Sequence, residues 1–525
     1  MPVIATISRL SLFVLFAISI SIAEEDVEIK LDISKTIVGR AKNPGIVGRL
    51  TQSGFDHLLN SILAELGGEV EGEPLPAYNG TSKLVVGTVK YQVDGVKFLE
   101  FDTSSAEIYS IPGKGLMLNI TDAHATVVGN WSYSYRAFFF TVSDIGTFYI
   151  VIRGLTFELE VLIGSDELGQ PTLDTGACLA TLDSLDIELT GGKSWLYSLF
   201  SGSIRSSLEN DIKEKACAEV EGFVQNFGVQ LREQMLNAPV IPGIADMAFG
   251  FVNPPYFTDN YVDVSVEGQI YVDEPSGNLP FAATPMNRTD ISTRMTYIWI
   301  SDYVFNSLGY SLYKSGTLKY TLQPFNVDLV PADSVLHEIL PLEAYALRRT
   351  FPKVFEDFPE SSIQLSFEMP APPKFQSSKR GIFLTVPGMV SLLAVNGHDN
   401  ETITNHILSV LGTLEFLLVP NMEGDHLYSH ATLTGFKMDL DSSIIDVQEW
   451  QLEALERAIR VILEDAGMPW LNRALKHGSH FPVIGPQWNY KNSNVTTHEG
   501  YILVEADYGI LEETKNVTSV DTKAI

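Results

Sequence analysis

The chain has 525 residues, of which 45% are hydrophobic and 10% aromatic, and its formal net charge is -30. A chain of this length exceeds one ordinary hydrophobic core, and its apolar content is typical of folded proteins, so we predict two or more domains. Nucleic acids and anionic membranes are bound mainly through Lys and Arg, and the acidic balance therefore argues against both partners. A lipid bound by this chain should be held by apolar contacts.

Residues 1–23 are typical of a secretory signal peptide. Arg9 precedes the apolar run Leu10 to Ile22, and Ala23 completes a small-residue cleavage pattern ahead of the acidic residues that start at Glu24. The alternative is an uncleaved membrane anchor, but the run is shorter than the roughly 20 apolar residues that span a bilayer. We therefore expect a soluble, secreted, extracellular protein.

The first half of the chain combines helical and strand patterns. Apolar residues recur at helical spacing in Ile46 to Leu66, and a second, long helix is expected over Ser194 to Leu236. Leu155 to Ile163 alternates apolar and polar residues, as does Tyr261 to Val272, which predicts strands with one buried and one wetted face. The order is helix, strand meander, long helix and closing strand.

The second half repeats this order. Helices are expected over Asp333 to Arg349 and over Val447 to Ala474, where leucines and isoleucines form a stripe. Alternating patterns predict strands at Ile363 to Met369 and at the closing segment Tyr501 to Tyr508. The repeated order indicates a duplicated α+β plan.

Composition marks the domain boundaries. Asp273 to Ile291 contains three prolines and a glycine, which is typical of a linker. Residues 511–525 are polar and should form a flexible tail. We therefore predict an N-terminal domain over residues 24–272 and a C-terminal domain over residues 292–510.

The chain contains only two cysteines, Cys178 and Cys217. In an oxidising secretory route an isolated pair is more often a disulfide than a metal or redox centre, so we predict that they form a disulfide. Asn-x-Ser/Thr motifs fit the same route, and we expect glycosylation at most of them. The seven motifs begin at Asn79, Asn119, Asn130, Asn287, Asn400, Asn494 and Asn516.

The sequence carries no recognisable catalytic signature. It has no Gly-x-Ser-x-Gly elbow, no His-Glu-x-x-His motif and no glycine-rich phosphate loop. His426 and His430 are four residues apart, but their segment reads as a loop that leads into a strand, so we interpret them as surface histidines and not as metal ligands. We predict no catalytic residue, no metal and no cofactor, which makes a lipase-like enzyme the weakest hypothesis.

A cluster of aromatic residues has two interpretations. A strand pair could pack these rings into the core, or an aromatic hairpin at one end of the molecule could touch a lipid surface, where Trp and Tyr suit the membrane–water boundary. The sequence leaves both open. The cluster comprises Trp131, Tyr133, Tyr135, Phe138, Phe139 and Phe140.

Four segments stand out by their order and spacing: Asn43 to Thr51, Tyr297 to Gly309, His477 to Pro482 and Gly500 to Tyr508. The cysteine pair adds to them, with one residue after the strand meander and one in the expected long helix. Together these features resemble the family of bactericidal/permeability-increasing protein, lipopolysaccharide-binding protein and plasma lipid-transfer proteins. The resemblance covers nearly the whole chain after residue 23.

The resemblance implies a boomerang of two elongated barrels, each a twisted antiparallel sheet wrapped around a long helix, joined by a central sheet. Each barrel would leave an apolar pocket for the acyl chains of a phospholipid, with the head group near solvent. Apolar residues of the first helix and of two strands are our candidates for its lining, although plain core packing explains each of them equally well. They are Leu58, Leu59, Ile62, Leu155, Phe157, Leu159, Val262, Val264 and Val266.

Two departures from the family narrow the function. The segment Gly129 to Arg136 is rich in Lys and Arg in endotoxin-binding members, but here it keeps only Arg136 and carries a glycosylation motif. The polar tail also replaces the amphipathic helix that ends the neutral-lipid transfer member. We therefore expect a secreted protein that binds and transfers phospholipids, with transient contact with membranes or lipid particles. Recognition of lipopolysaccharide or another microbial lipid in innate immunity is the alternative.

Overall fold

A computed structural model describes much of the chain between residues 43 and 510. The expected signal peptide and tail lie outside the described residues. The described ranges are 43–60, 74–75, 78–83, 87–191, 209, 217–218, 221–222, 224–226, 228–229, 232, 237–241, 245–272, 279–316, 318–322, 348–358, 361–398, 401–480 and 488–510.

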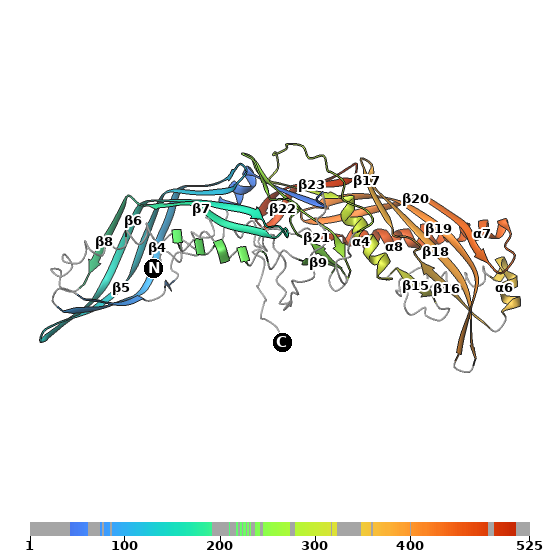
Figure 1. Cartoon of the computed structure of the whole chain (residues 1–525), viewed down its shortest axis with the longest axis horizontal. Helices are drawn as coiled ribbons and strands as arrows, with labels where there is room; N and C mark the ends of the chain where they lie inside the picture. Colours follow the sequence, from blue (N-terminus) through green and yellow to red (C-terminus); the bar gives the residue numbers. More distant parts are fainter. Residues whose placement is uncertain are drawn as a thin grey trace, which may run out of the picture.

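The molecule is elongated and bent, with one sheet-rich arm on each side of a central sheet (Figure 1). We call these the N-terminal and C-terminal arms. Each is built on a 7-stranded sheet, and a 6-stranded and a 3-stranded sheet complete the fold. Over the described residues neither arm's sheet closes into a ring, so each arm is an open, curved antiparallel sheet. The predicted plan, two elongated sheet-and-helix units joined by a central sheet, is confirmed.

The central sheet takes strands from both halves of the chain. Val47, Arg49 and Thr51 alternate as the buried residues of its strand β1, which pairs with β12 on one side and with β14 on the other. The strands in spatial order are β11 (Tyr256–Phe257), β12 (Tyr261–Val266), β1 (Ile46–Thr51), β14 (Thr296–Ser301), β23 (Tyr501–Ile510) and β22 (Trp488–His498).

The helix predicted over Ile46 to Leu66 is therefore wrong at its start. Ile46–Thr51 is a strand because partners on both edges satisfy its backbone, and this tertiary pairing overrides the helical spacing of its apolar residues. Residues 52–60 are helical, and residues 61–66 lie outside the described part.

Three long strands dominate the N-terminal sheet. Within β6 the predicted alternation is confirmed, since Leu155, Phe157 and Leu159 are buried while Glu158 is exposed. Of the long helix predicted over Ser194 to Leu236, the described residues are helical. The strands are β2 (Pro74–Leu75), β3 (Tyr78–Lys83), β4 (Thr88–Ile111), β5 (Gly115–Ala137), β6 (Phe140–Ser165), β7 (Pro171–Thr181) and β8 (Ser184–Thr190).

The C-terminal sheet repeats this design. The strand predicted at Ile363 to Met369 is confirmed as β16, whereas residues 333–347 of a predicted helix lie outside the described part. The strands are β15 (Lys319–Leu322), β16 (Ser362–Glu368), β17 (Lys374–Ser378), β18 (Gly381–His398), β19 (Glu401–Glu423), β20 (His426–Ser443) and β21 (Ser479–His480).

Helices accompany the C-terminal sheet. The helix predicted over Val447 to Ala474 is present as α7, a π-helical turn η3 and α8. It begins where the Gln451 side chain accepts a hydrogen bond from the backbone N–H of Gln448 at 2.8 Å, a capping interaction. The described helices are α4 (Asp302–Lys314), α6 (Pro352–Asp357), α7 (Glu449–Ile462), η3 (Leu463–Gly467) and α8 (Met468–His477).

The predicted closing strands have different outcomes. The strand at Tyr501 to Tyr508 is confirmed as β23, but the strand expected over Tyr261 to Val272 ends at Val266. Gly268 has a φ of 68°, which turns the chain out of the sheet. Beyond this turn the chain forms β13 in the 3-stranded sheet, whose strands are β9 (Asn237–Ile241), β10 (Ala245–Ala248) and β13 (Ile270–Tyr271).

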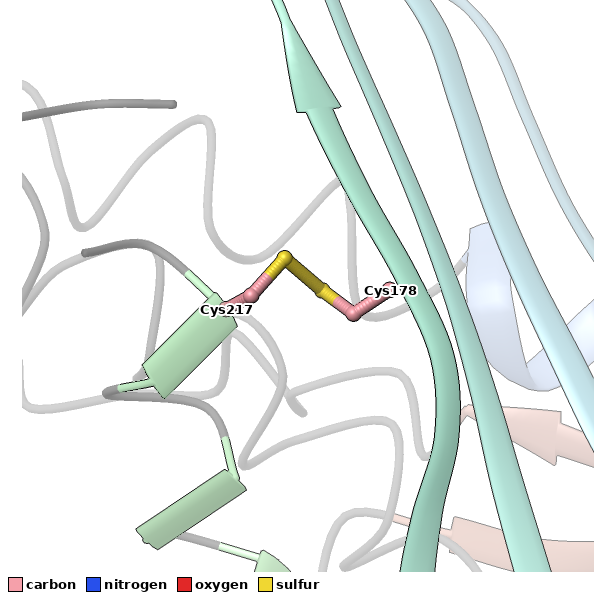
Figure 2. The surroundings of a disulfide bond; sticks show 2 residues. All are labelled: Cys178 and Cys217. Atoms are coloured by element: carbon pink, nitrogen blue, oxygen red, sulfur yellow. A yellow bond between two sulfur atoms is a disulfide. The ribbon is translucent and has the colours of Figure 1, made fainter. Parts of the chain in front are cut away.

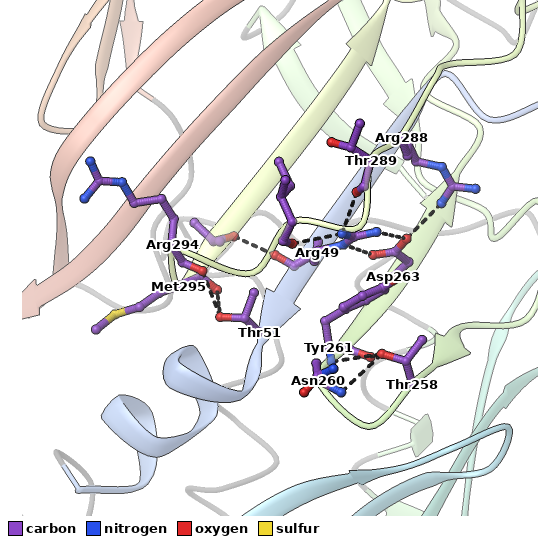
Figure 3. A network of polar contacts seen from close by, with 12 residues as sticks. Arg49, Thr51, Thr258, Asn260, Tyr261, Asp263, Arg288, Thr289, Arg294 and Met295 are labelled. Atoms are coloured by element: carbon purple, nitrogen blue, oxygen red, sulfur yellow. Dashed lines mark hydrogen bonds and ion pairs between the residues drawn. The ribbon is translucent and has the colours of Figure 1, made fainter.

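A second correction concerns the polar residues of β12. Asp263 and Ser265 were expected to face water, but they are only 3% and 8% exposed. Asp263 accepts two hydrogen bonds from the buried Arg49, at 2.7 and 3.0 Å (Figure 3). Burial alone would lower the pKa of Arg49, but the hydrogen bond and ion pair with Asp263 outweigh it and raise that pKa. The Arg49 guanidinium therefore stays charged inside the protein.

Residues 279–291, which we call the strap, cover this face of the central sheet. The Arg49 guanidinium donates to the carbonyls of Thr289 and Ile291, both at 3.0 Å, and Arg288 contacts Asp263 at 3.0 Å (Figure 3). Ile291 also packs on the aromatic cluster around Trp299. The described part of the predicted linker is thus held against the sheet, while the domain boundary placed there stays a prediction.

Candidate lipid-binding site

The N-terminal sheet has one face buried in a large apolar cluster, which we call its inner face. Leu118 pairs with Leu159 and Ile120 with Phe157, and all four side chains belong to this cluster. Residues 52–60 add Leu59 to it. Described pieces of the helix that follows β8 run along the concave side of this sheet (Figure 1). The inner face is therefore an apolar layer between sheet and helix.

The predicted disulfide is present. Cys178 in β7 is bonded to Cys217 across a Cα–Cα distance of 5.8 Å (Figure 2). Farther along the same helical stretch, Val224 is fully buried in the inner-face cluster. The helix is therefore attached to the sheet both covalently and by packing.

Burial on the inner face decreases toward the free end of the arm. Along β5 the inner residues Leu118 and Val127 are 4% and 1% exposed, but Trp131, Tyr133 and Tyr135 are only half-buried. Trp131 and Tyr133 stack with ring centroids 5.8 Å apart, and Trp131 Nε1 donates to the Thr147 carbonyl at 3.0 Å. The inner face thus changes from closely packed aliphatic residues to a partly open aromatic wall.

Within this wall, the Tyr133 hydroxyl is a buried polar atom that has no hydrogen-bond partner among the residues that the structure describes. Burial, with a contribution from Asp144, raises the pKa of Tyr133, so the phenol remains protonated. It is a donor that a bound lipid oxygen could satisfy.

The end of the N-terminal arm is a bare aromatic turn. Phe138 and Phe139 connect β5 to β6, and Phe140 begins β6; the three are 78%, 103% and 53% exposed. This turn lies at the far end of the arm from the central sheet (Figure 1). We call these three residues the tip. The first three rings face the inner wall and the last three face solvent. Contact of this turn with a lipid surface stays a prediction.

Strand pairing brings a second cation near the tip, which the sequence did not indicate. Arg136 pairs with Thr88, and Lys90, two residues along β4, pairs with Ser134. Both cations are exposed and lie on the outer face of the sheet. Only the register between β4 and β5 could have revealed this proximity, since Lys90 lies in a different strand from Arg136.

The nine residues predicted to line a pocket do not all come together. Leu59, Leu155, Phe157, Leu159 and Val262 share the inner-face cluster, and Val264 packs at its border. Ile62 lies outside the described residues.

The other two predicted lining residues belong elsewhere. Leu58 joins a separate cluster with Val504 and Tyr508 of the central sheet, because successive helix residues point about 100° apart. Val266 is buried but belongs to neither cluster.

The C-terminal arm carries a looser counterpart of this layer. Leu452 and Leu455 of α7 and Leu471 and Leu475 of α8 pack against the sheet, yet each stays partly exposed. No residue of α8 is buried. The apolar stripe of these helices is therefore only half covered by the sheet.

The histidine pair occupies a strand, which corrects the predicted loop. His426 and His430 lie in β20, where pairing with β19 fixes them in an extended backbone. His426 Nε2 lies 2.7 Å from the backbone carbonyl of His477. In the part of the chain that the structure describes, no three or more acidic, histidine or cysteine side chains gather where they could hold a metal ion.

The glycosylation motifs are mostly accessible where the structure describes them. Asn79, Asn130, Asn287 and Asn494 are exposed, and Asn119 is half-buried. Asn400 and Asn516 lie outside the described residues.

Across the described ranges, no helix combines the length and hydropathy needed to span a bilayer. Two open sheets, each with helices on one side, share a central sheet and define a bent, two-armed architecture. The family model for the LBP / BPI / CETP N-terminal domain matches residues 54–227, and the model for the C-terminal domain matches residues 241–510. The chain belongs to the LBP / BPI / CETP family, as its sequence resemblance implied.

Similar proteins cover most of the chain. The bactericidal permeability-increasing protein of Sebastes schlegelii is 24% identical over 476 residues, 89% of this chain and 95% of that protein. The Rattus norvegicus protein of that name is 26% identical over 483 residues, 91% and 96% of the two chains. The lipopolysaccharide-binding protein of Homo sapiens is 23% identical over 452 residues, which are 84% of this chain and 89% of that protein. A crystal structure of lipopolysaccharide binding protein covers 90% of this chain and 100% of its own, with 20% identity and a TM-score of 0.49.

Proposed function

We propose that this chain is a secreted, non-enzymatic protein that binds phospholipids in its two arms and transfers them between lipid surfaces. The observation that carries the proposal is the graded inner face of the N-terminal sheet. Fully buried aliphatic residues near the central sheet give way to the half-buried Trp131, Tyr133 and Tyr135, and then to the exposed tip. Such a gradient offers a continuous apolar path from a lipid surface into the arm.

The physical demands of this function are modest. Each methylene of an acyl chain removed from water contributes about 0.8 kcal/mol, so a long chain supplies a large driving force without a charged partner. We propose that Leu59, Leu155, Phe157, Leu159 and Val262 form the floor of the N-terminal site, because one cluster contains them all. The half-covered helices α7 and α8 support a second site in the C-terminal arm.

Bound lipid is the direct test. The secreted protein is extracted with organic solvent, the extract is analysed by mass spectrometry, and uptake of labelled phospholipid is measured. We expect co-purified phospholipid and saturable uptake. An extract without lipid, together with no uptake, would contradict the proposal.

The tip should provide the contact with lipid surfaces. Replacing Phe138, Phe139 and Phe140 together by Ser gives what we call the tip variant. Transfer of each Phe into lipid contributes about 1.5–3 kcal/mol, so the tip variant should lose binding to phosphatidylcholine vesicles by well over tenfold. Vesicle sedimentation measures this loss.

A matched control removes an exposed aromatic residue outside both arms. Tyr256 of β11 in the central sheet is 61% exposed, and its replacement by Ser should leave vesicle binding unchanged. Equal losses in the control and the tip variant would argue against a specific role of the tip.

Recognition of lipopolysaccharide is the second candidate, favoured by Lys90 and Arg136 beside the tip and by the name of one group of relatives. Phosphate recognition by these cations should weaken as salt rises. Replacing both with Gln should then reduce binding to lipopolysaccharide vesicles but not to phosphatidylcholine vesicles. Equal binding of lipopolysaccharide by this variant and the unmodified protein would exclude that role for the two cations.

A further inference from the structure

Two glycosylation motifs lie on β5 and point away from the inner face. Asn119 stands between Leu118 and Ile120, which are both buried inward, so the alternation of the strand directs its side chain outward. Asn130 precedes Trp131, which packs against the inner cluster, and is therefore directed outward as well. Both asparagines lie on the outer face of the N-terminal sheet.

Exposed apolar side chains flank Asn130 on this outer face. Asn130 pairs with Thr147 of β6, so Ile145 and Tyr149, two residues to either side of Thr147, are its diagonal neighbours at about 7 Å. Ile145 is 73% exposed and Tyr149 is 39% exposed. These two side chains form an apolar surface centred on the asparagine.

The surroundings of Asn119 are similar. It pairs with Glu107 of β4, which makes Tyr109 its diagonal neighbour, and Tyr109 is 41% exposed. Exposed apolar groups of this kind promote association unless something covers them or uses them. The same strand thus places a motif for a large, hydrophilic modification beside Tyr109 and another between Ile145 and Tyr149.

The backbone next to Asn130 is fitted to its side chain. Strand β4 bulges between Asp94 and Lys97, and Gly95 in this bulge has a φ of 57°. Nδ2 of Asn130, the atom to which an N-linked glycan is attached, donates to the Asp94 carboxylate at 3.3 Å, and a Cβ atom at Gly95 would lie 2.8 Å from it. The glycine therefore avoids a clash with the Asn130 side chain, which remains exposed.

We propose that N-linked glycans at Asn119 and Asn130 cover Tyr109, Ile145 and Tyr149 on the outer face and so direct lipid contact to the tip. The proposal rests on the lipid contact proposed for the tip. While the glycans are present, they keep the outer face from adsorbing to a lipid surface or to a second copy of the chain.

The test uses the full-length protein secreted from eukaryotic cells. Thr121→Ala and Ser132→Ala remove both motifs, while Thr121→Ser and Ser132→Thr preserve them and serve as the matched control. Each pair is combined with the tip variant, and glycopeptide mass spectrometry measures occupancy. With the motifs preserved, vesicle binding should stay lost. With the motifs removed, phosphatidylcholine vesicle binding and the fluorescence of an apolar dye should both rise several-fold.

Enzymatic removal of glycans from the folded tip variant provides a second preparation that does not depend on the folding of the alanine variants, and it should give the same rise. If Asn119 and Asn130 carry no glycan, or if neither vesicle binding nor dye fluorescence rises in either preparation, the proposal that glycans cover the outer face is wrong. A fully glycosylated tip variant that binds vesicles as well as the unmodified protein would instead overturn the proposed role of the tip, and the dye signal would still decide whether glycans cover the outer face.

Discussion

The two arms share one plan but end in different chemistry. Each contains a meander of three long strands, β4–β5–β6 in the N-terminal arm and β18–β19–β20 in the C-terminal arm. The turn between β5 and β6 presents three phenylalanines to solvent. Between the end of β18 at His398 and the start of β19 at Glu401, the sequence Asp399-Asn400 is polar. The strands determine the length of an arm, whereas the few residues at its end determine whether that end presents an apolar or a polar surface.

The arms also differ in how their helices are attached. A disulfide between Cys178 and Cys217 joins helix to sheet in the N-terminal arm. In the C-terminal arm, Asn472 of α8 makes the equivalent connection by hydrogen bonds, since its side chain accepts from the Ala431 N–H at 2.7 Å and donates to the Ala431 carbonyl at 3.0 Å. A covalent bond fixes the first helix, and a reversible pair of hydrogen bonds holds the second.

Breaking the junction between the arms should have the largest effect on stability, and it should affect both. Asp263→Asn leaves the buried Arg49 charge without its counter-ion, which costs about 3–5 kcal/mol. Hydrogen exchange of peptides from β5 and from β19 should accelerate together. As a control, Asp186→Asn disrupts an exposed ion pair with Arg153 and should change little. Acceleration in one arm alone would mean that the central sheet does not couple the arms.

Removal of the disulfide should destabilise the N-terminal arm and leave the C-terminal arm unchanged. Replacing Cys178 and Cys217 with Ser opens a loop with a sequence separation of 39 and should cost about 4 kcal/mol in the chain-entropy model. Hydrogen exchange should accelerate in β5, β6 and β7 but not in the C-terminal strands. A uniform acceleration would show that the bond stabilises more than its own arm.

The smallest effect of the three should follow from Asn472→Ala. Loss of two hydrogen bonds to Ala431, which is 1% exposed, should cost about 2 kcal/mol and accelerate exchange in β20 only. Lys476→Ala, at an exposed position of the same helix, is the control. If the N-terminal arm responds equally, the two helices are not attached independently.

Elements with a strict local pattern were predictable. The alternation in Leu155 to Ile163 and in Tyr501 to Tyr508 predicted real strands, since period 2 matches the two faces of a sheet. The disulfide also followed from the number of cysteines and the expected redox environment.

Elements that depend on distant partners were not predictable. Ile46–Thr51 has helical spacing but lies between two strands that begin more than 200 residues later. The alternation in sequence predicts that Asp263 faces solvent, but in the structure Arg49 and the strap cover it. Of the candidate lining residues, Leu58 and Leu59 are neighbours in sequence yet belong to different clusters.

The sequence by itself determined the duplicated strand-and-helix order, the cysteine pair and the family, because these depend on local periodicity, composition and short motifs. Only the tertiary structure decided which cations stand near the tip, which asparagines share a face with exposed apolar residues, and which half of the aromatic cluster meets solvent. Those properties depend on strand register, and register is set by pairing across the sheet between residues far apart in the chain.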